Sequence, residues 1–306
     1  MHDKLDASMG RAFQREKVES MAYPEGMRAI PREPGFLLVD DEKLYYETVG
    51  AGEPVVFCHG LGGNGGIWYQ QVAAFASQYQ VVVWDQRGFG RSTDNARKCS
   101  PATAVKDLRR LLDHLDIDRA HLIGQSMGGW AALGFAVEAP DRVRSLTLAS
   151  TTAGIPLPPE IVHSAVQRLA LDRPETQFLG LHPAIDERLS ERDLALSYLY
   201  QVIGSFGAER SNAAMMAKLL ATAYDSDRIA KVDCPVLFVF GENDQTIPAP
   251  LIRVLAASVR GALTVEIPEA GHSPYFESAS TWNTIVKRFL ENRTVPSPES
   301  LIRGLW

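Results

Sequence analysis

The sequence predicts an α/β protein built on a mostly parallel, doubly wound sheet with a block of helices inserted into it. Three observations support this fold class. Short apolar runs typical of buried strands alternate with helical patterns, as expected when helices cover both faces of a parallel sheet. A serine flanked by glycines stands between one such strand and the following helix. The alternation then stops over residues 155–232, which show helical patterns but no good strand.

The first part of the α/β core is expected at residues 31–154, after a loosely packed N-terminal arm, 1–30, that is polar and mixed in charge. Residues 36–39 and 43–49 are expected to form a starting hairpin that turns near Asp40-Asp41-Glu42. The later strands of this part are predicted at 54–58, 81–84, 119–123 and 143–148, and its helices at 67–77, 102–115 and 130–137.

The block at 155–232 is expected to form a helical lid over the site. Its helices are predicted at 160–171, 190–203 and 212–223. Because its apolar residues have helical spacing, most of them must form the core of the lid itself. Strands resume at 235–240 and 263–267 in the second part of the core, 233–293, and a tail with two prolines follows at 294–306.

The most informative stretch is Gly124-Gln125-Ser126-Met127-Gly128, which fits the G-x-S-x-G pattern of a nucleophile elbow. In such an elbow the serine stands at the apex of a sharp strand-to-helix turn, where neighbouring side chains would clash. Glycines at positions 124 and 128 remove those side chains. The turn exposes the Ser126 hydroxyl and directs the Met127 amide and the helix N-terminus towards a developing negative charge.

A base and an acid follow the serine in the chain order that this arrangement requires. Asp244 and His272 each stand just past the end of a predicted strand. In an open parallel sheet, ligands bind at that edge. A serine is a poor nucleophile without a base, and the base needs an orienting acid. Asp85 precedes the elbow and Glu242 lies closer to its strand, so both are expected to brace loops instead.

The glycine-rich loop after Cys58 begins with His59-Gly60-Leu61 and is expected to supply a second amide for an oxyanion hole. We assign that hole to the Leu61 and Met127 amides, with Gly60 beside the substrate. The loop lacks both the G-K-[ST] ending of a phosphate-binding loop and the G-x-G-x-x-G spacing of a dinucleotide site. The His59 ring is expected to brace the loop by hydrogen bonds.

Taken together, these motifs identify the chain as resembling the α/β-hydrolase-fold serine hydrolases. The matching segments are CHGLGG (58–63), WDQRGFGRS (84–92), GQSMGGW (124–130), FGENDQTIP (240–248) and AGHSPYFE (270–277). The resemblance implies an α/β-hydrolase fold with an inserted helical lid and a catalytic triad of Ser126, Asp244 and His272. Trp130 and Tyr275 are expected to contact substrate. The resemblance implies neither a cofactor nor a metal.

The subgroup that the motifs resemble contains enol-lactonases, small carboxylesterases, cofactor-free haloperoxidase-like perhydrolases and meta-cleavage C–C hydrolases. We therefore expect cleavage of a small to medium, largely apolar ester or lactone through an acyl-enzyme. Hydrolysis of a C–C bond in a meta-cleavage diketone, or perhydrolysis, is an alternative on the same triad. It ranks lower because meta-cleavage hydrolases usually resemble GNSMGG at the elbow, whereas this chain has GQSMGG. A non-catalytic receptor of the same fold is a further alternative.

Composition fits a single enzyme of 306 residues, of which 45% are hydrophobic. The net charge of −6, with no basic stripe, argues against nucleic acid as a partner. Cys58, Cys99 and Cys234 suggest no disulfide framework and no metal spacing. No run approaches the ~20 apolar residues of a membrane helix, and we see no signal peptide. The expectation is a cytoplasmic protein, compatible with a homodimer, that acts on a small molecule.

Overall fold

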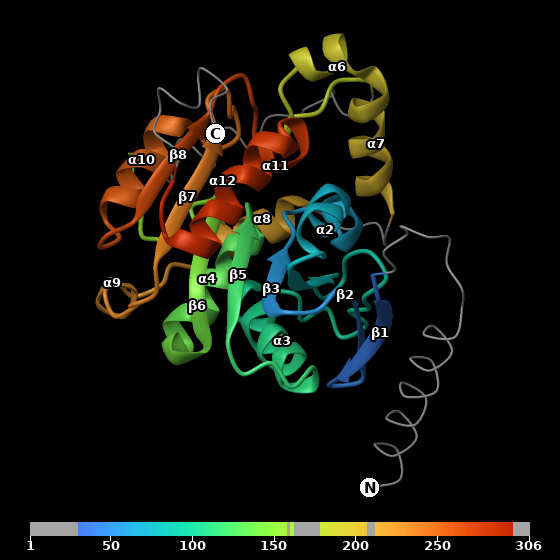
Figure 1. The fold of residues 1–306 in the computed structure, drawn as a ribbon, viewed down its shortest axis with the longest axis vertical. Coiled ribbons are helices and arrows are strands. Elements are labelled where there is room, and N and C mark those ends of the chain that lie inside the picture. Colours follow the sequence, from blue (N-terminus) through green and yellow to red (C-terminus); the bar gives the residue numbers. More distant parts are fainter. Residues whose placement is uncertain (1–29, 158–159, 162–177, 207–211, 296–306) are drawn as a thin grey trace, which may run out of the picture. The chain divides into compact units, whose positions relative to one another are not determined.

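The computed structural model describes residues 30–157, 160–161, 178–206 and 212–295, which Figure 1 draws in colour. The expected N-terminal arm falls almost entirely outside the described residues. Most of the expected C-terminal tail and most of the helix predicted at 160–171 also fall outside them.

An eight-stranded sheet forms the centre, in the order β1-β2-β4-β3-β5-β6-β7-β8. Its strands are β1 (Arg32–Val39), β2 (Glu42–Val49), β3 (Glu53–Cys58), β4 (Tyr79–Trp84), β5 (Ala120–Gln125), β6 (Val143–Ala149), β7 (Val236–Gly241) and β8 (Leu263–Ile267). The β1–β2 and β2–β4 pairs are antiparallel, and all other neighbours are parallel. The predicted mostly parallel α/β sheet is therefore confirmed.

Helices cover both faces of the sheet, because alternate residues of each strand face opposite cores. On β3, Val56 packs in the core with helices α3 (Pro101–His114), α4 (Gly128–Glu138) and α10 (Ala249–Ala257). Its neighbour Phe57 packs in the other core, with α2 (Tyr69–Phe75) and α12 (Ala279–Asn292). The short helices η1 (Gly65–Trp68), η2 (Pro140–Arg142) and α11 (Pro274–Glu277) lie in the connections. No helix among the described residues is long and apolar enough to span a membrane.

Strand β1 begins at Arg32, four residues earlier than predicted. Pro34 and Gly35 argued against a strand in this part of the sequence, because both residue types are unusual in strand interiors. An edge strand tolerates them, and here Arg32 pairs with Val49 across the hairpin. Its guanidinium also forms an ion pair with Glu47 at 2.6 Å. The predicted turn is confirmed: it follows β1 directly, and Asp40 has a φ of 50°.

The described residues between β6 and β7 form helices and connecting loops but no strand, and we call those within 155–232 the helical insertion. Its helices are α6 (Arg188–Arg192), α7 (Leu194–Ser205), α8 (Asn212–Leu220) and α9 (Ser226–Ile229). The single helix predicted at 190–203 is divided at Asp193, whose extended backbone (φ −151°) ends α6. The Asp193 carboxylate then accepts the Leu196 amide and starts α7.

A polar cluster on β3, β5 and β6 joins buried His121 and Ser145 to exposed Glu53. The imidazole of His121 is fully buried, and its Nδ1 lies 2.7 Å from Ser145 Oγ. Its Nε2 lies 3.3 Å from Glu53 Oε2. Burial lowers the pKa of His121 from 6.5 to about 4, the hydrogen bond to Glu53 opposes this shift, and Arg144 and Arg293 add to it. The folded protein therefore holds this ring neutral in mildly acidic solution.

We expect His121 to make the fold less stable as the pH falls from 6.5 towards 4. The unfolded chain takes up a proton in that window and the folded chain does not, so the free energy of unfolding decreases by up to ~3 kcal/mol. Urea unfolding of wild type and His121→Gln between pH 7 and 4.5 measures this. The difference in stability between the two proteins should narrow on acidification, and parallel pH curves would contradict the expectation. The pKa of His182 is lowered in the same way, but His182 is present in both proteins, so its effect on stability cancels in the comparison.

Candidate active site

Ser126 stands at the turn between β5 and α4 with a φ of 47°. Residues other than glycine rarely adopt this left-handed conformation, which costs about 1–3 kcal/mol. Two hydrogen bonds hold the strained residue in place. The Ser126 amide donates to Ala149 O at 2.9 Å, and Thr151 Oγ1 donates to Ser126 O at 2.6 Å. The backbone is thus fixed, while the half-buried side chain remains accessible.

Close backbone approaches explain the two glycines of the elbow. A Cβ on Gly124 would lie 2.5 Å from the carbonyl oxygen of Gly128. A Cβ on Gly128 would lie 2.1 Å from the carbonyl oxygen of Cys58 at the end of β3. No side chain fits at either position, because backbone atoms cannot move aside as a flexible side chain can. The glycines therefore let helix α4 pack directly on β5 and β3.

Asp244 and His272, which follow β7 and β8, are joined by a hydrogen bond of 2.8 Å from His272 Nδ1 to Asp244 Oδ2. Both side chains are buried. Asp244 Oδ1 accepts the amides of Thr246 and Ile247 at 2.9 and 2.8 Å, which fixes the carboxylate with Oδ2 towards the ring. Since a carboxylate accepts the Nδ1 proton, Nε2 of the neutral imidazole carries a free lone pair.

The elbow and the histidine loop are joined by Gln125, the residue that precedes Ser126. Its side-chain Nε2 donates to His272 O at 3.2 Å. The Ser126 hydroxyl makes no hydrogen bond within the described part of the chain. In ligand-free enzymes the bond between nucleophile and base is often long and tightens only when substrate binds. The structure thus brings Ser126, Asp244 and His272 to the same edge of the sheet, where the sequence predicted them.

The glycine-rich loop after β3 lies against the elbow. A Cβ on Gly60 would lie only 3.2 Å from the Cβ of Ser126, so backbone runs next to the serine. Within the described residues, neither the Leu61 amide nor the Met127 amide donates a hydrogen bond. These two backbone donors, one in the glycine-rich loop and one in the residue after Ser126, therefore have no hydrogen-bond partner within the described residues.

The predicted bracing role of His59 is confirmed. Its Nδ1 donates to Gly60 O at 2.8 Å, and its Nε2 accepts the Gln86 amide at 3.0 Å. The Gln86 side chain donates back to His59 O at 2.6 Å. Burial lowers the pKa of this imidazole. Both ring nitrogens are occupied, so His59 holds the loop and has no position free for proton transfer.

The two rival acids also brace loops, as predicted. Buried Asp85 accepts the Gly65 amide at 2.6 Å and the Arg91 amide at 2.7 Å, one on each oxygen. Exposed Glu242 accepts the Glu269 amide at 3.1 Å.

The predicted substrate contacts Trp130 and Tyr275 are packed in the protein interior. Trp130 is 6% exposed, and its indole Nε1 donates to Thr222 O of the helical insertion at 3.1 Å. Tyr275 is 1% exposed, and its ring centroid lies 4.3 Å from that of Trp68. This placement gives Trp130 a role in fastening the insertion and Tyr275 a role in the core beneath the histidine loop.

His182, which no sequence motif indicated, lies near His272. Its Nδ1 accepts the Ala184 amide at 3.1 Å, and its ring packs edge-on against Tyr200 with centroids 5.0 Å apart. The Tyr200 hydroxyl in turn lies 2.9 Å from Ser273 Oγ, next to His272. Burial lowers the pKa of His182 to about 4, and the nearby His272 adds to the effect. A neutral imidazole therefore packs on Tyr200, whose hydroxyl reaches the residue next to His272.

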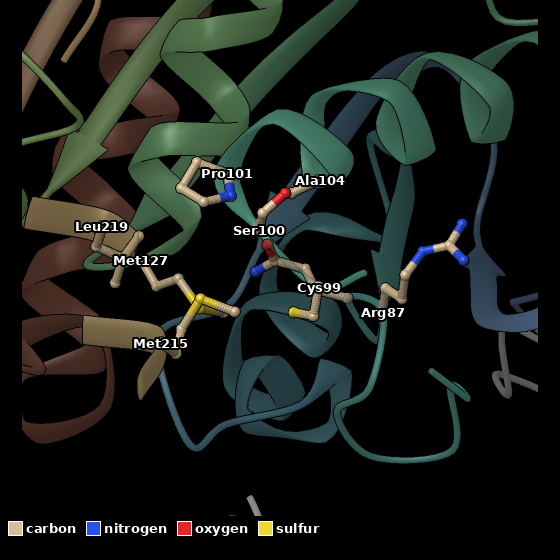
Figure 2. Close-up of a pocket in the computed structure, with 9 residues that line it drawn as sticks. Arg87, Cys99, Ser100, Pro101, Ala104, Met127, Met215 and Leu219 are labelled. Atoms are coloured by element: carbon tan, nitrogen blue, oxygen red, sulfur yellow. The ribbon is translucent and has the colours of Figure 1, made fainter. Parts of the chain in front are cut away.

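A small apolar cavity opens beside the elbow, on the side of the Met127 side chain (Figure 2). Its lining includes Cys99, Pro101, Met127, Met215 and Leu219. Arg87 contributes to the lining, but Figure 2 shows its guanidinium directed away from the methionines. That group forms a buried ion pair with Asp107 at 2.7 Å, so its charge is already neutralised. No cluster of His, Cys, Asp or Glu in the described residues could hold a metal ion.

Comparisons with known proteins agree with this architecture. A family model described as alpha/beta hydrolase fold matches residues 53–279. The protein named "Putative carbamate hydrolase RutD" from Azorhizobium caulinodans is 30% identical over 243 residues, which are 76% of this chain and 89% of that protein. The 2-hydroxy-6-oxo-6-phenylhexa-2,4-dienoate hydrolase of Burkholderia cepacia is 29% identical over 266 residues, 82% of this chain and 92% of that protein.

Among solved structures, the chain is similar to Est816, described as an N-acyl homoserine lactone degrading enzyme. The TM-score is 0.70 at 29% identity, over 83% of this chain and 100% of that chain. The names of these three similar proteins point to different substrates.

Proposed function

Because the chain belongs to the α/β-hydrolase fold family, we propose that it is a serine hydrolase that cleaves a small to medium, largely apolar carboxylic ester or lactone through an acyl-enzyme. The observation that carries this proposal is the hydrogen-bonded Asp244–His272 pair at the edge of the sheet where the Ser126 elbow stands. A buried acid that orients an imidazole beside an accessible serine is the arrangement that activates a hydroxyl for acyl transfer.

In the first half-reaction, His272 Nε2 removes the proton from the Ser126 hydroxyl as its oxygen attacks the substrate carbonyl carbon. The tetrahedral intermediate then breaks its bond to the leaving oxygen, which takes the proton from His272. In the second half-reaction, His272 removes a proton from water, the hydroxide attacks the acyl-enzyme, and Ser126 regains its proton. The products are a carboxylic acid and an alcohol, which for a lactone are parts of one hydroxy acid. Asp244 stabilises the imidazolium in both steps.

The Leu61 and Met127 amides form the oxyanion hole in this proposal. Two observations support this assignment: neither amide has a hydrogen-bond acceptor within the described residues, and the backbone at Gly60 lies close to Ser126. Each such donor lowers the barrier by about 3 kcal/mol. The N-terminus of α4 adds its dipole on the same side.

The helical insertion acts as the lid, corresponding to the block at 155–232 between the core parts 31–154 and 233–293. It is fastened to the loops around the serine. Asn64, in the glycine-rich loop, donates from Nδ2 to Ile203 O of α7 at 2.7 Å. Tyr224 donates from its hydroxyl to Trp130 O of α4 at 2.7 Å. In Figure 1, α6 and α7 lie beyond the end of the sheet towards which the arrows of β3 and β5 point.

The apolar side chains next to the elbow favour an uncharged acyl group. Leu61, Met127, Met215 and Leu219 pack in one apolar cluster next to the elbow. The nearby Lys218 ammonium is occupied, because it donates to Cys99 O at 2.7 Å. Apolar walls with few polar groups favour apolar ligands. The lactone-degrading function in the name of the similar Est816 supports the same class.

The similar dienoate hydrolase from Burkholderia cepacia favours a second candidate, cleavage of a C–C bond in a meta-cleavage diketone on the same serine, aspartate and histidine. Perhydrolysis and a non-catalytic ligand receptor are the remaining alternatives. The cytoplasmic location and the homodimer stay predictions from the sequence.

We expect a fluorophosphonate to add one mass increment to the peptide that contains Ser126. Ser126→Ala should abolish both labelling and turnover, because no other side chain replaces the nucleophile, and its melting temperature should stay close to that of wild type. Mass spectrometry of the labelled digest and an esterase assay measure this. Labelling at another residue, or a fully active Ala variant, would refute the role of Ser126.

Asp244→Asn should lower kcat by about 10⁴-fold, because an amide stabilises the wrong tautomer of the catalytic imidazole. Glu242→Gln is the matched control, since Glu242 lies on the same loop, is exposed, and within the described residues hydrogen-bonds a loop amide alone. It should retain most of its activity. Steady-state kinetics of both variants decide the assignment, which is wrong if Asp244→Asn stays near wild type.

Uncharged p-nitrophenyl esters and simple lactones should be turned over faster than dicarboxylic, cationic or diketone substrates. Within the uncharged series the preference should be shallow, because each methylene contributes only ~1–3 kcal/mol. A panel of kcat/KM values measures both statements. A clear preference for a charged substrate would exclude the apolar class, and diketone cleavage above every ester would favour the second candidate.

A further inference from the structure

Glu277, the last residue of α11, places a half-buried carboxylate next to the backbone of the candidate catalytic histidine. Its Oε2 accepts the Gly271 amide at 3.0 Å, and its Oε1 accepts the Ser273 amide at 3.0 Å. These two amides flank His272 on both sides. Hydrogen bonds to a carboxylate are roughly twice as strong as neutral ones, so one side chain fixes the backbone around the base.

The same carboxylate also reaches the helical insertion. Glu277 Oε2 accepts a third amide, that of Asp186, at 2.8 Å. A Cβ on Gly271 would lie only 2.5 Å from this Asp186 nitrogen, so the two backbones are in direct contact. Glu277 therefore joins a segment of the insertion to the loop that carries the base.

A second set of bonds joins the same segment to the loop that carries the acid. Asn243, the neighbour of Asp244, donates from Nδ2 to Asp186 Oδ2 at 2.7 Å. Thr246, which also binds the Asp244 carboxylate through its amide, donates from Oγ1 to Pro183 O at 3.0 Å. Residues 183–186 thus bridge the two loops whose relative position sets the Asp244–His272 hydrogen bond.

Burying a carboxylate is costly, and here burial raises the pKa of Glu277 despite the three amide bonds. An apolar residue would fill the space without that cost but would leave three buried amides without a partner. A carboxylate is the side chain with two acceptor oxygens and no donor, and it satisfies all three.

We propose that Glu277 is a positioning residue, which sets the place of His272 by holding the backbone on both sides of it and by locking residues 183–186 of the helical insertion to it. This inference rests on the proposed hydrolase function. It makes the insertion part of the assembly of the triad as well as its roof. Glu277 touches no reacting atom, so its effect passes through the orientation of the imidazole towards Ser126.

Glu277→Gln keeps the size of the side chain but turns an NH₂ donor towards amides that need an acceptor. We expect kcat per active site to fall 10- to 100-fold with KM within about twofold of wild type, because the substrate contacts are unchanged. The rate of fluorophosphonate labelling at Ser126 should fall by a similar factor. Active sites are counted by complete titration, at a temperature where circular dichroism shows the variant folded.

Glu242→Gln is the control for losing a carboxylate that binds a loop amide at the same edge, and it should leave both rates unchanged. If Glu277→Gln does not fold, Glu277→Asp takes its place. Its shorter arm cannot reach all three amides, so the same selective loss in kcat is expected. A variant that is folded, less stable and equally active per site would overturn the positioning role.

Failure of the proposed function is distinguishable from failure of this inference. A wild type that is never labelled on Ser126 overturns the hydrolase proposal, and the positioning role with it. A labelled wild type together with an equally fast Glu277 variant overturns the positioning role alone. A rise in KM with kcat unchanged would also overturn the positioning role, because it would place Glu277 in substrate binding.

Discussion

The left-handed backbone of Ser126 is the constraint on which the rest of the site depends. It is stable only because Ala149 and Thr151 bond its amide and carbonyl, and because Gly124 and Gly128 let α4 pack onto the sheet. The strain is small compared with the packing of the whole core, so the fold can hold it. In return, the serine hydroxyl lies at the carboxyl edge of the sheet, next to the glycine-rich loop.

Each loop at that edge is held by polar groups that take no part in the chemistry. His59 and Asp85 hold the glycine-rich loop, Gln125 ties the elbow to His272, and Glu242 supports the turn after β8. The loops contain many backbone amides that cannot pair within a strand. Side chains, most of them buried, satisfy these amides, and in doing so they fix the distances between the loops.

The helical insertion is bound to the core at several points. Asn64 and Trp130 hold it beside the elbow, and Glu277 and Asn243 hold it beside the base and the acid. An insertion attached in this way cannot move without affecting the loops that it contacts. The apolar wall that would choose the acyl group and the bonds that orient the histidine therefore belong to one continuous structure.

Much of the fold and of the candidate site could be predicted from the sequence, because the relevant patterns are local. Apolar strand runs and the glycines around Ser126 each occupy a few consecutive residues, and the order of serine, acid and histidine can be read along the chain although the three lie far apart in it. The start of β1 could not be predicted, since its pairing with β2 overrides the effect of Pro34 and Gly35. The break between α6 and α7 depends on how Asp193 caps α7, which periodicity alone does not show.

The sequence by itself determined the sheet, the elbow and the identity of the three candidate catalytic residues, because those features follow from residue types and their order. The tertiary structure decided which neighbours those residues have. It packed Tyr275 against Trp68 in the core, brought His182 close to His272, and gave Glu277 three amides to hold. These contacts join segments that are far apart in the chain, and burial of a side chain depends on the packing of all of them together.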